Sequence, residues 1–219
     1  MNNLVGYLTY RLNLGCFAVT GDIGSVYNYI TTGNGLAIQA ENQHIWSRFI
    51  IAPAEVRGLP KIEDCSFTMK HGKIPQRLWD LALSVFLAEP DKERYAGIIW
   101  DPSTPLGING GCHLFVPEQR GTGTRLEYQC GENVVLELHS HPGMGPFFSA
   151  TDDKDEQGLK IYGVVGMEDV GGVEGLTLSV NLRLGVYGYF HPVAWGEVFE
   201  GRLGDVKDVV ELDKKEEGQ

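Results

Sequence analysis

Residues 176–184, a nine-residue segment in the last quarter of the chain, alternate strictly between apolar and polar side chains and constrain the fold more than any other stretch. The even-numbered positions are all leucine or valine. The odd-numbered positions carry Thr177, Ser179, Asn181 and Arg183. Because successive side chains of a strand point to opposite faces of a sheet, the segment is predicted to be a β-strand with one buried and one solvent-facing side. Residues 187–190 are expected to pair with it across a glycine-containing turn.

The composition also favours a β-rich fold with many turns. Glycine and proline supply 29 and 10 of the 219 residues, a share well above the usual total of about 12%. Apolar residues make up 42% and charged residues 21%, which suffices for a sizeable core and excludes wholesale disorder. The length fits one catalytic-size domain with room for an additional subdomain.

The charge and the cysteines indicate a cytoplasmic protein that binds neither nucleic acid nor membranes. The net charge of −11 repels phosphate backbones and anionic lipid surfaces. The four cysteines form no CxxC pair and are expected to be buried free thiols. The first residues are a poor signal peptide, and no apolar run reaches the ~20 residues of a membrane span.

The chain is expected to divide into three parts. Residues 1–70 carry strand and turn signals, including a hairpin between 27–30 and 36–39, and form a β-rich accessory region. A main domain spans 71–200, and a charged tail, frayed or helical at its end, spans 201–219.

Within the main domain, residues 75–88 are predicted to form a helix that begins near Pro75. Its apolar face at helical spacing consists of Leu78, Leu81, Ala82 and Val85. Apolar runs at 95–100, 134–138 and 161–165 are predicted strands.

One group of polar residues carries the chemistry. His139 and His141 follow the apolar run 134–138, and Ser149 and Asp152 come shortly after a turn rich in proline and glycine. Residues two apart on a strand share a face, so both imidazoles can converge on one point. The spacing of Ser149 and Asp152 is that of a capping box at a helix start, which would hold the aspartate near the strand end. Two imidazoles and one carboxylate, with a fourth position left for water, are the ligand set of a catalytic zinc.

The pattern H-x-H-P-x6-S-x-x-D resembles the motif of the JAMM (MPN+) metalloproteases, also called the JAB or Mov34 family. The resemblance covers residues 74–200, extends to the order of helices and strands, and places a JAB/MPN metalloprotease domain at 71–200. It implies an α/β (α+β) fold with a curved mixed sheet flanked by helices, here with the β-rich N-terminal extension. More narrowly, the whole chain resembles proteins of the bacterial ParB-related, ThiF-related cassette (PRTRC).

The resemblance also implies roles for individual residues. His139, His141 and Asp152 would bind one Zn²⁺ per chain. Ser149 would stabilise the oxyanion of the tetrahedral intermediate, and an upstream glutamate would act as the general base.

Two glutamates are candidates for that base, and a third, Glu137, is assigned to the surroundings of the site or the sheet surface. Relatives carry Glu-x-x-Gly at a strand start, whereas Glu93 has one more residue before Gly97, which suggests a small bulge or helical turn there. Glu93 is preferred, and Glu89 at the end of the predicted helix is the weaker choice. Glu137 lies on the face of the two histidines but matches a non-catalytic position of the family.

The leading hypothesis is therefore a zinc-dependent peptidase or isopeptidase. Its substrate would be the C-terminal tail of a ubiquitin-like or sulfur-carrier-like protein, with a ThiF/E1-like protein of the same cassette as a partner. The alternative is a catalytically silent MPN-type scaffold or interaction module. A zinc deaminase is disfavoured because H-x-E and P-C-x-x-C are both missing.

Overall fold

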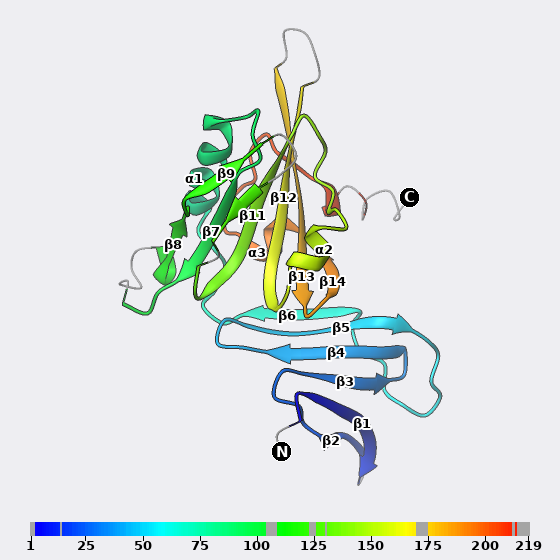
Figure 1. The fold of residues 1–219 in the computed structure, drawn as a ribbon. Helices are drawn as coiled ribbons and strands as arrows, with labels where there is room; N and C mark the ends of the chain where they lie inside the picture. The colour runs from blue at the N-terminus through cyan, green and yellow to red at the C-terminus, as the bar shows by residue number, and fades with distance from the viewer. Residues whose placement is uncertain are drawn as a thin grey trace. The chain divides into compact units, whose positions relative to one another are not determined.

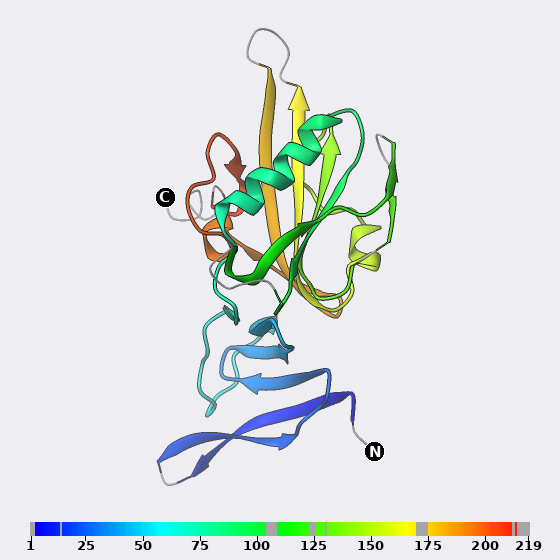
Figure 2. The same ribbon diagram turned by 90° about the vertical axis from the view of Figure 1, so that its left-hand side faces the viewer.

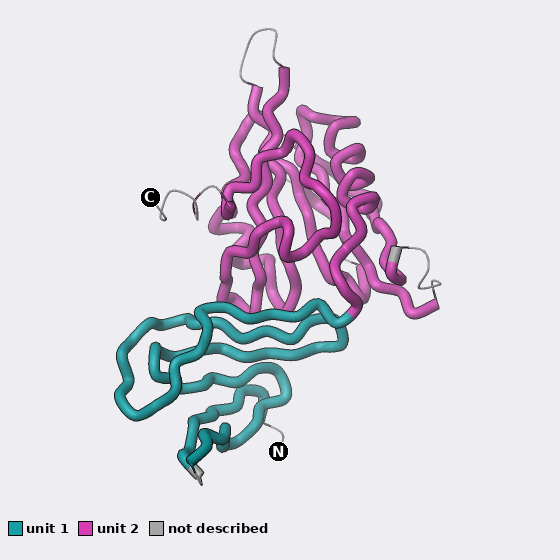
Figure 3. Tube along the Cα trace, turned by 180° about the vertical axis from the view of Figure 1, so that it is seen from behind, with its two compact units in different colours: residues 1–70 teal, residues 71–219 magenta. Residues whose placement is uncertain are grey.

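The chain divides into two compact units, Met1–Lys70 and His71–Gln219 (Figure 3). Each unit is described by itself. The computed structural model describes residues 3–13, 15–103, 109–122, 126–129, 131–169, 175–211 and 213.

The first unit is built on one six-stranded sheet in the order β2-β1-β3-β4-β5-β6. The strands are β1 (Val5–Asn13), β2 (Cys16–Asp22), β3 (Tyr27–Thr32), β4 (Gly35–Glu41), β5 (Ile45–Pro53) and β6 (Cys65–Met69). Neighbours are antiparallel except β1 and β3, which run parallel. The predicted hairpin is confirmed, with Thr32 opposite Gly35 across a two-residue loop. Leu8, Ile30 and Ala37 form a buried cluster in this unit.

The second unit contains a seven-stranded sheet whose main path is β14-β13-β12-β11-β7-β8. Its strands are β7 (Tyr95–Trp100), β8 (Cys112–Phe115), β11 (Val134–Pro142), β12 (Leu159–Asp169), β13 (Leu176–Val186), β14 (Tyr189–Val193) and β15 (Lys207–Asp208). A separate hairpin pairs β9 (Gln119–Gly121) with β10 (Leu126–Tyr128). β11 runs antiparallel to β7 and parallel to β12, so the sheet is mixed.

Helix α1 (Gln76–Ala88) and helix α2 (Asp152–Asp155) lie on opposite faces of this sheet (Figures 1 and 2). The predicted α1 is confirmed, but its buried face consists of Leu78, Trp79, Ala82 and Phe86. Leu81, which was expected on that face, is exposed. The rings of Trp79 and Phe86 take the core positions instead. Trp79 packs against Trp195, the first residue of helix α3 (Trp195–Val198), and against Phe199, which follows that helix.

The alternating segment forms β13, but the prediction that one of its faces is exposed to solvent is wrong. Ser179 and Arg183, on the polar side, are only 5% and 7% exposed. The guanidinium of Arg183 contacts Phe148, Asp153 and Glu156, which belong to α2 and the residues around it. A chain segment distant in sequence therefore covers the face that the alternation assigns to solvent.

The turn between β13 and β14 follows the expected hairpin geometry. Val186 pairs with Tyr189, and the two loop residues, Tyr187 and Gly188, have φ values of 49° and 89°. Positive φ at both central residues is the type I′ geometry that matches the twist of the flanking strands.

The segment expected to be a charged tail, 201–219, packs on the second unit in the part that the structure describes. Val206, Asp208 and Val210 are buried, and β15 pairs with β13. The Asp208 carboxylate accepts a hydrogen bond of 2.6 Å from the backbone N–H of Trp195 at the start of α3. The mixed α/β fold with a β-rich N-terminal sheet is confirmed. Among the described helices, none has the length and apolar character needed to cross a membrane.

We propose that the two units are separately folded domains. The backbone of Ile74 is hydrogen-bonded to Val198 and Glu200 within the second unit, so the connection is confined to the residues around Lys70 and Lys73. Limited trypsin digestion should cut first at these lysines and leave two protease-resistant fragments, identified by mass spectrometry. A chain that resists cleavage there, or one that is degraded throughout, would contradict the proposal.

Candidate metal centre

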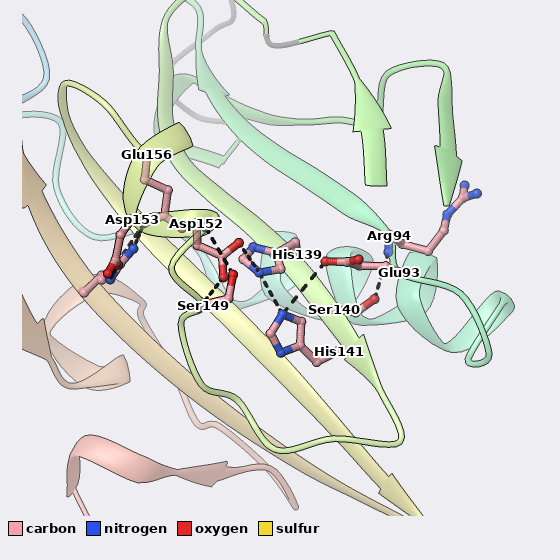
Figure 4. Close-up of polar contacts among 10 residues, drawn as sticks. Glu93, Arg94, His139, Ser140, His141, Ser149, Asp152, Asp153 and Glu156 are labelled. Atoms are coloured by element: carbon pink, nitrogen blue, oxygen red, sulfur yellow. Dashed lines mark hydrogen bonds and ion pairs between the residues drawn. The ribbon is translucent and has the colours of Figure 1, made fainter. Parts of the chain in front are cut away.

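The residues singled out by the sequence meet on the α2 side of the second sheet (Figure 4). His139 and His141 come from the end of β11, Asp152 begins α2, and Glu93 lies just before β7. Ser149 lies in the connection between β11 and α2. Three segments of the chain therefore contribute to one cluster.

Strand geometry brings the two imidazoles together. His139 and His141 are two apart on β11, and Ser140 between them is fully buried with its hydroxyl facing away toward the backbone of Arg94. The Nε2 atoms of the two histidines are 3.2 Å apart. Asp152 Oδ1 lies 3.5 Å from Nε2 of His139. Two imidazole nitrogens and a carboxylate oxygen thus point into a common space.

Ser149 and Asp152 hold each other by a reciprocal pair of hydrogen bonds. The Ser149 backbone N–H donates to Asp152 Oδ2 at 2.6 Å, and the Asp152 N–H donates to Ser149 Oγ at 3.2 Å. These are the bonds of the expected capping box, but the helix begins at Asp152 itself and lasts four residues. The pairing leaves Oδ1 of the aspartate facing His139 and leaves the serine O–H free to donate.

Glu93 faces His141 because of the register between β7 and β11. His139 pairs with Tyr95. One residue further, the backbone N–H of Ser140 donates to the Arg94 carbonyl at 2.9 Å. Glu93 therefore comes opposite His141, and its Oε1 lies 3.9 Å from Nε2 of that histidine. Directly opposed residues of an antiparallel pair share a face.

The irregularity expected between Glu93 and Gly97 lies elsewhere. Positions 93, 95 and 97 fall on one face by simple alternation, so the extra residue needs no bulge there. The register shift occurs instead at Val135, on β11.

A hairpin that the sequence reasoning did not connect with the site holds the start of β7. The Glu93 N–H donates to the Thr122 carbonyl at 2.8 Å. The side chain of Gln119 both accepts from the Tyr95 N–H at 2.7 Å and donates to the Tyr95 carbonyl at 3.0 Å. A Cβ at Gly121 would lie 2.0 Å from the Glu93 carbonyl oxygen, so only glycine, which has no side chain, fits at this position. No motif in the sequence signals these contacts, because they join residues more than 20 positions apart.

The electrostatics of the cluster favour neutral imidazoles and a basic Glu93. Burial lowers the pKa of His139 to about 4 and also lowers the pKa of His141. Burial, with a further contribution from the charge of Asp152, raises the pKa of Glu93 to about 7. Neutral imidazole is the form that binds metals, and a carboxylate with a pKa near neutrality suits a general base.

Glu89, the weaker candidate for the base, is engaged elsewhere. Its carboxylate pairs with Lys92 at 2.5 Å and with Arg94 at 2.7 Å. The hydrogen bond from Lys92 and the charge of Arg94 lower the pKa of Glu89. Glu137 lies on the histidine face as expected, where it forms an ion pair with Lys160.

Two overlapping groups of side chains can hold a metal ion. One consists of Glu93, His139 and His141, and the other of His139, Asp152 and Glu156. Within each group the ligand atoms lie within 4.8 Å of one another, and His139 belongs to both. The three expected ligands are thus divided between two groups that share one histidine. A mixed set of imidazole and carboxylate donors fits zinc.

Glu156 and Arg183 are the residues that the sequence analysis missed. Glu156 is buried, and burial raises its pKa to about 8 although the charge of Arg183 beside it favours the ionised form. The sequence contained one signal, the single charged residue among the polar positions of the alternating segment 176–184, but solvent exposure explained it equally well.

Residues 77–178 match the family model described as prokaryotic homologs of the JAB domain. The matched range includes Glu93, His139, His141, Ser149 and Asp152, so this part of the chain is similar to the Prok-JAB domain. The family resemblance is confirmed at this level, whereas the narrower resemblance to the PRTRC cassette stays a prediction. A comparison with curated proteins finds no match.

The raised pKa of Glu93 predicts a pH-dependent stability in metal-free protein. The folded state keeps a proton up to about pH 7 that the unfolded chain releases near 4.5, so stability falls as the pH rises between these values. Glu93→Gln removes the loss of stability that ionisation of the buried carboxylate causes. In urea unfolding with a chelator present, the variant should match wild type near pH 4.5 and exceed it by about 2–3 kcal/mol at pH 8.

Glu89→Gln provides the matched control, because the pKa of Glu89 is shifted in the opposite direction. That variant should gain no stability at pH 8. An advantage of Glu93→Gln that is the same at every pH would show that Glu93 has an ordinary pKa.

Proposed function

We propose that the protein is a zinc-dependent JAMM-type hydrolase that cleaves a peptide or isopeptide bond. The observation that carries the proposal is the convergence of His139, His141, Asp152 and Glu93 within a Prok-JAB domain. A bound zinc ion would act as a Lewis acid that polarises the scissile carbonyl and lowers the pKa of the attacking water toward about 7.

The chain's own residues divide the remaining work. Glu93, with its raised pKa, accepts a proton from the attacking water and passes it to the leaving nitrogen as the C–N bond breaks. The products are a carboxylate and an amine. The Oγ atom of Ser149 accepts a hydrogen bond from the Asp152 N–H. The Ser149 O–H donates a hydrogen bond to the carbonyl oxygen of the scissile bond, which becomes negative during attack.

For the substrate we propose the C-terminal tail of a ubiquitin-like or sulfur-carrier-like protein, with a ThiF/E1-like protein as a partner. The support is the resemblance of the whole chain to the PRTRC cassette, since ThiF-like proteins activate such tails. An extended tail can add to a sheet edge through its backbone. In the described part of the chain, β8 is the last strand on the Glu93 side of the sheet.

The alternative, a silent scaffold of the same fold, receives less support. A scaffold has no need to bury a carboxylate beside two neutral imidazoles, because burial of a polar group costs free energy. Here the full donor set is present, and the pKa values of Glu93 and His139 are both shifted strongly.

The metal is tested first. Wild-type protein should bind one equivalent of zinc, measured by inductively coupled plasma mass spectrometry, and His139→Ala/His141→Ala should lose it. A His71→Ala/His113→Ala variant, which removes two imidazoles elsewhere in the second unit, serves as the control and should keep a full equivalent. Retention of zinc by the first variant would place the metal elsewhere.

The general base is tested by Glu93→Gln. This variant should keep zinc and fold, yet cleave a tail-fused ubiquitin-like protein about 10²–10⁴-fold more slowly, the usual contribution of general acid–base catalysis. Glu89→Gln should cleave at the wild-type rate, because its carboxylate is paired with Lys92 and Arg94. Equal rates for wild type and Glu93→Gln would assign the base to another residue.

A further inference from the structure

Arg183 is an arginine almost fully enclosed beside the metal centre. It lies in the second half of β13, and its side chain is 9% exposed. Its guanidinium carbon is 3.7 Å from the ring centre of Phe148 and 3.6 Å from that of Phe190. The guanidinium is therefore sandwiched between an aromatic ring of the segment before α2 and one of β14.

The same guanidinium reaches two carboxyl groups of α2 and its C-terminal cap. Its Nη1 donates to Asp153 Oδ1 at 2.6 Å, and its Nε donates to Glu156 Oε2 at 2.8 Å. Nη2 lies 2.7 Å from the same Glu156 oxygen. Glu156 also borders the site, because its carboxylate oxygen lies within 4.8 Å of ligand atoms of His139 and Asp152.

The three residues of this segment that Arg183 touches bracket the functional ones. Phe148 directly precedes Ser149, and Asp153 directly follows Asp152. Glu156 closes the helix, which is only four residues long. One helical turn has little intrinsic stability, so contacts to the sheet must hold it in place.

We propose that Arg183 is a positioning residue that clamps the segment from Phe148 to Glu156 onto the sheet and so fixes Asp152 and Ser149 relative to His139 and His141. The inference rests on the proposed metal site. It goes beyond the recognised domain as well, because Arg183 lies outside the matched range of 77–178.

The chemistry of the contacts requires arginine. A guanidinium is planar, donates in several directions at once and stacks on aromatic faces. Lysine carries the same charge at a single point and can neither stack between Phe148 and Phe190 nor donate in the plane to Asp153 and Glu156 together. Loss of the clamp should therefore appear even when the charge is kept.

The test uses the full chain as wild type, Arg183→Met, Arg183→Lys and Arg183→Met/Glu156→Gln. Zn²⁺ affinity is measured by competition with a chromophoric chelator, and the visible spectrum of bound Co²⁺ reports the ligand geometry. Urea unfolding of the metal-free proteins measures stability separately. Lys160→Met is the matched control, because it removes a cation paired with Glu137 on the same face without contacting the clamped segment.

We expect both single variants at Arg183 to bind Zn²⁺ about 10–100-fold more weakly, the usual effect of losing an outer-shell partner, and to change the Co²⁺ spectrum. Lys160→Met should stay within about twofold of wild type. The Arg183→Met/Glu156→Gln variant should recover stability, since it leaves no unpaired buried carboxylate, but should not recover Zn²⁺ affinity. This variant and Arg183→Lys keep the test decisive if Arg183→Met does not fold.

Three results would overturn the proposal. The first is a folded Arg183 variant with the Zn²⁺ affinity and the Co²⁺ spectrum of wild type. The second is recovery of Zn²⁺ affinity in Arg183→Met/Glu156→Gln. The third is a loss of Zn²⁺ affinity in Lys160→Met as large as that in the Arg183 variants. The second would mean that Arg183 only neutralises Glu156. Failure of the metal site itself has a different signature, because wild type would then bind no zinc or His139→Ala/His141→Ala would keep it.

Discussion

The pairing of β11 between β7 and β12 is the constraint on which the site depends. Its register places Tyr95 opposite His139, and the next residue pair brings Glu93 opposite His141. A slip of one residue in either strand would turn the histidines or the glutamate to the other face of the sheet. Such a slip is prevented by the fully buried residues Leu136 and Leu138 on the reverse face.

The carboxylates around this strand show how position alone separates their roles. Glu89 and Glu93 are four residues apart, yet the pKa of Glu89 is lowered by Lys92 and Arg94 while that of Glu93 is raised by burial. Glu89 is thereby kept charged, whereas the pKa of Glu93 lets its carboxylate take up a proton near neutral pH. Opposite shifts in neighbouring acids are characteristic of catalytic sites.

Buried carboxylates around the site need hydrogen-bond or ion-pair partners, and these partners explain how α2 is held against the sheet. Asp152 is held by the backbone N–H of Ser149, and Glu156 by Arg183. Arg183 is in turn enclosed by two aromatic rings. A helix of one turn can hold Asp152, a candidate metal ligand, in place because these contacts replace the stability that its length does not provide.

The sequence alone determined the position of α1, the main strands and the four motif residues that meet at the site. Each of these follows from local properties, namely side-chain periodicity, turn residues and the spacing of His139, His141, Ser149 and Asp152, whereas the fold class was implied by the resemblance of that motif to the JAB family. The tertiary structure decided which faces are covered. It buried Trp79 in place of Leu81, and it enclosed Arg183 on a strand face that alternation assigns to solvent. Alternation reports which side chains share a face, but what packs on that face depends on segments far away in the chain, here Phe148 to Glu156.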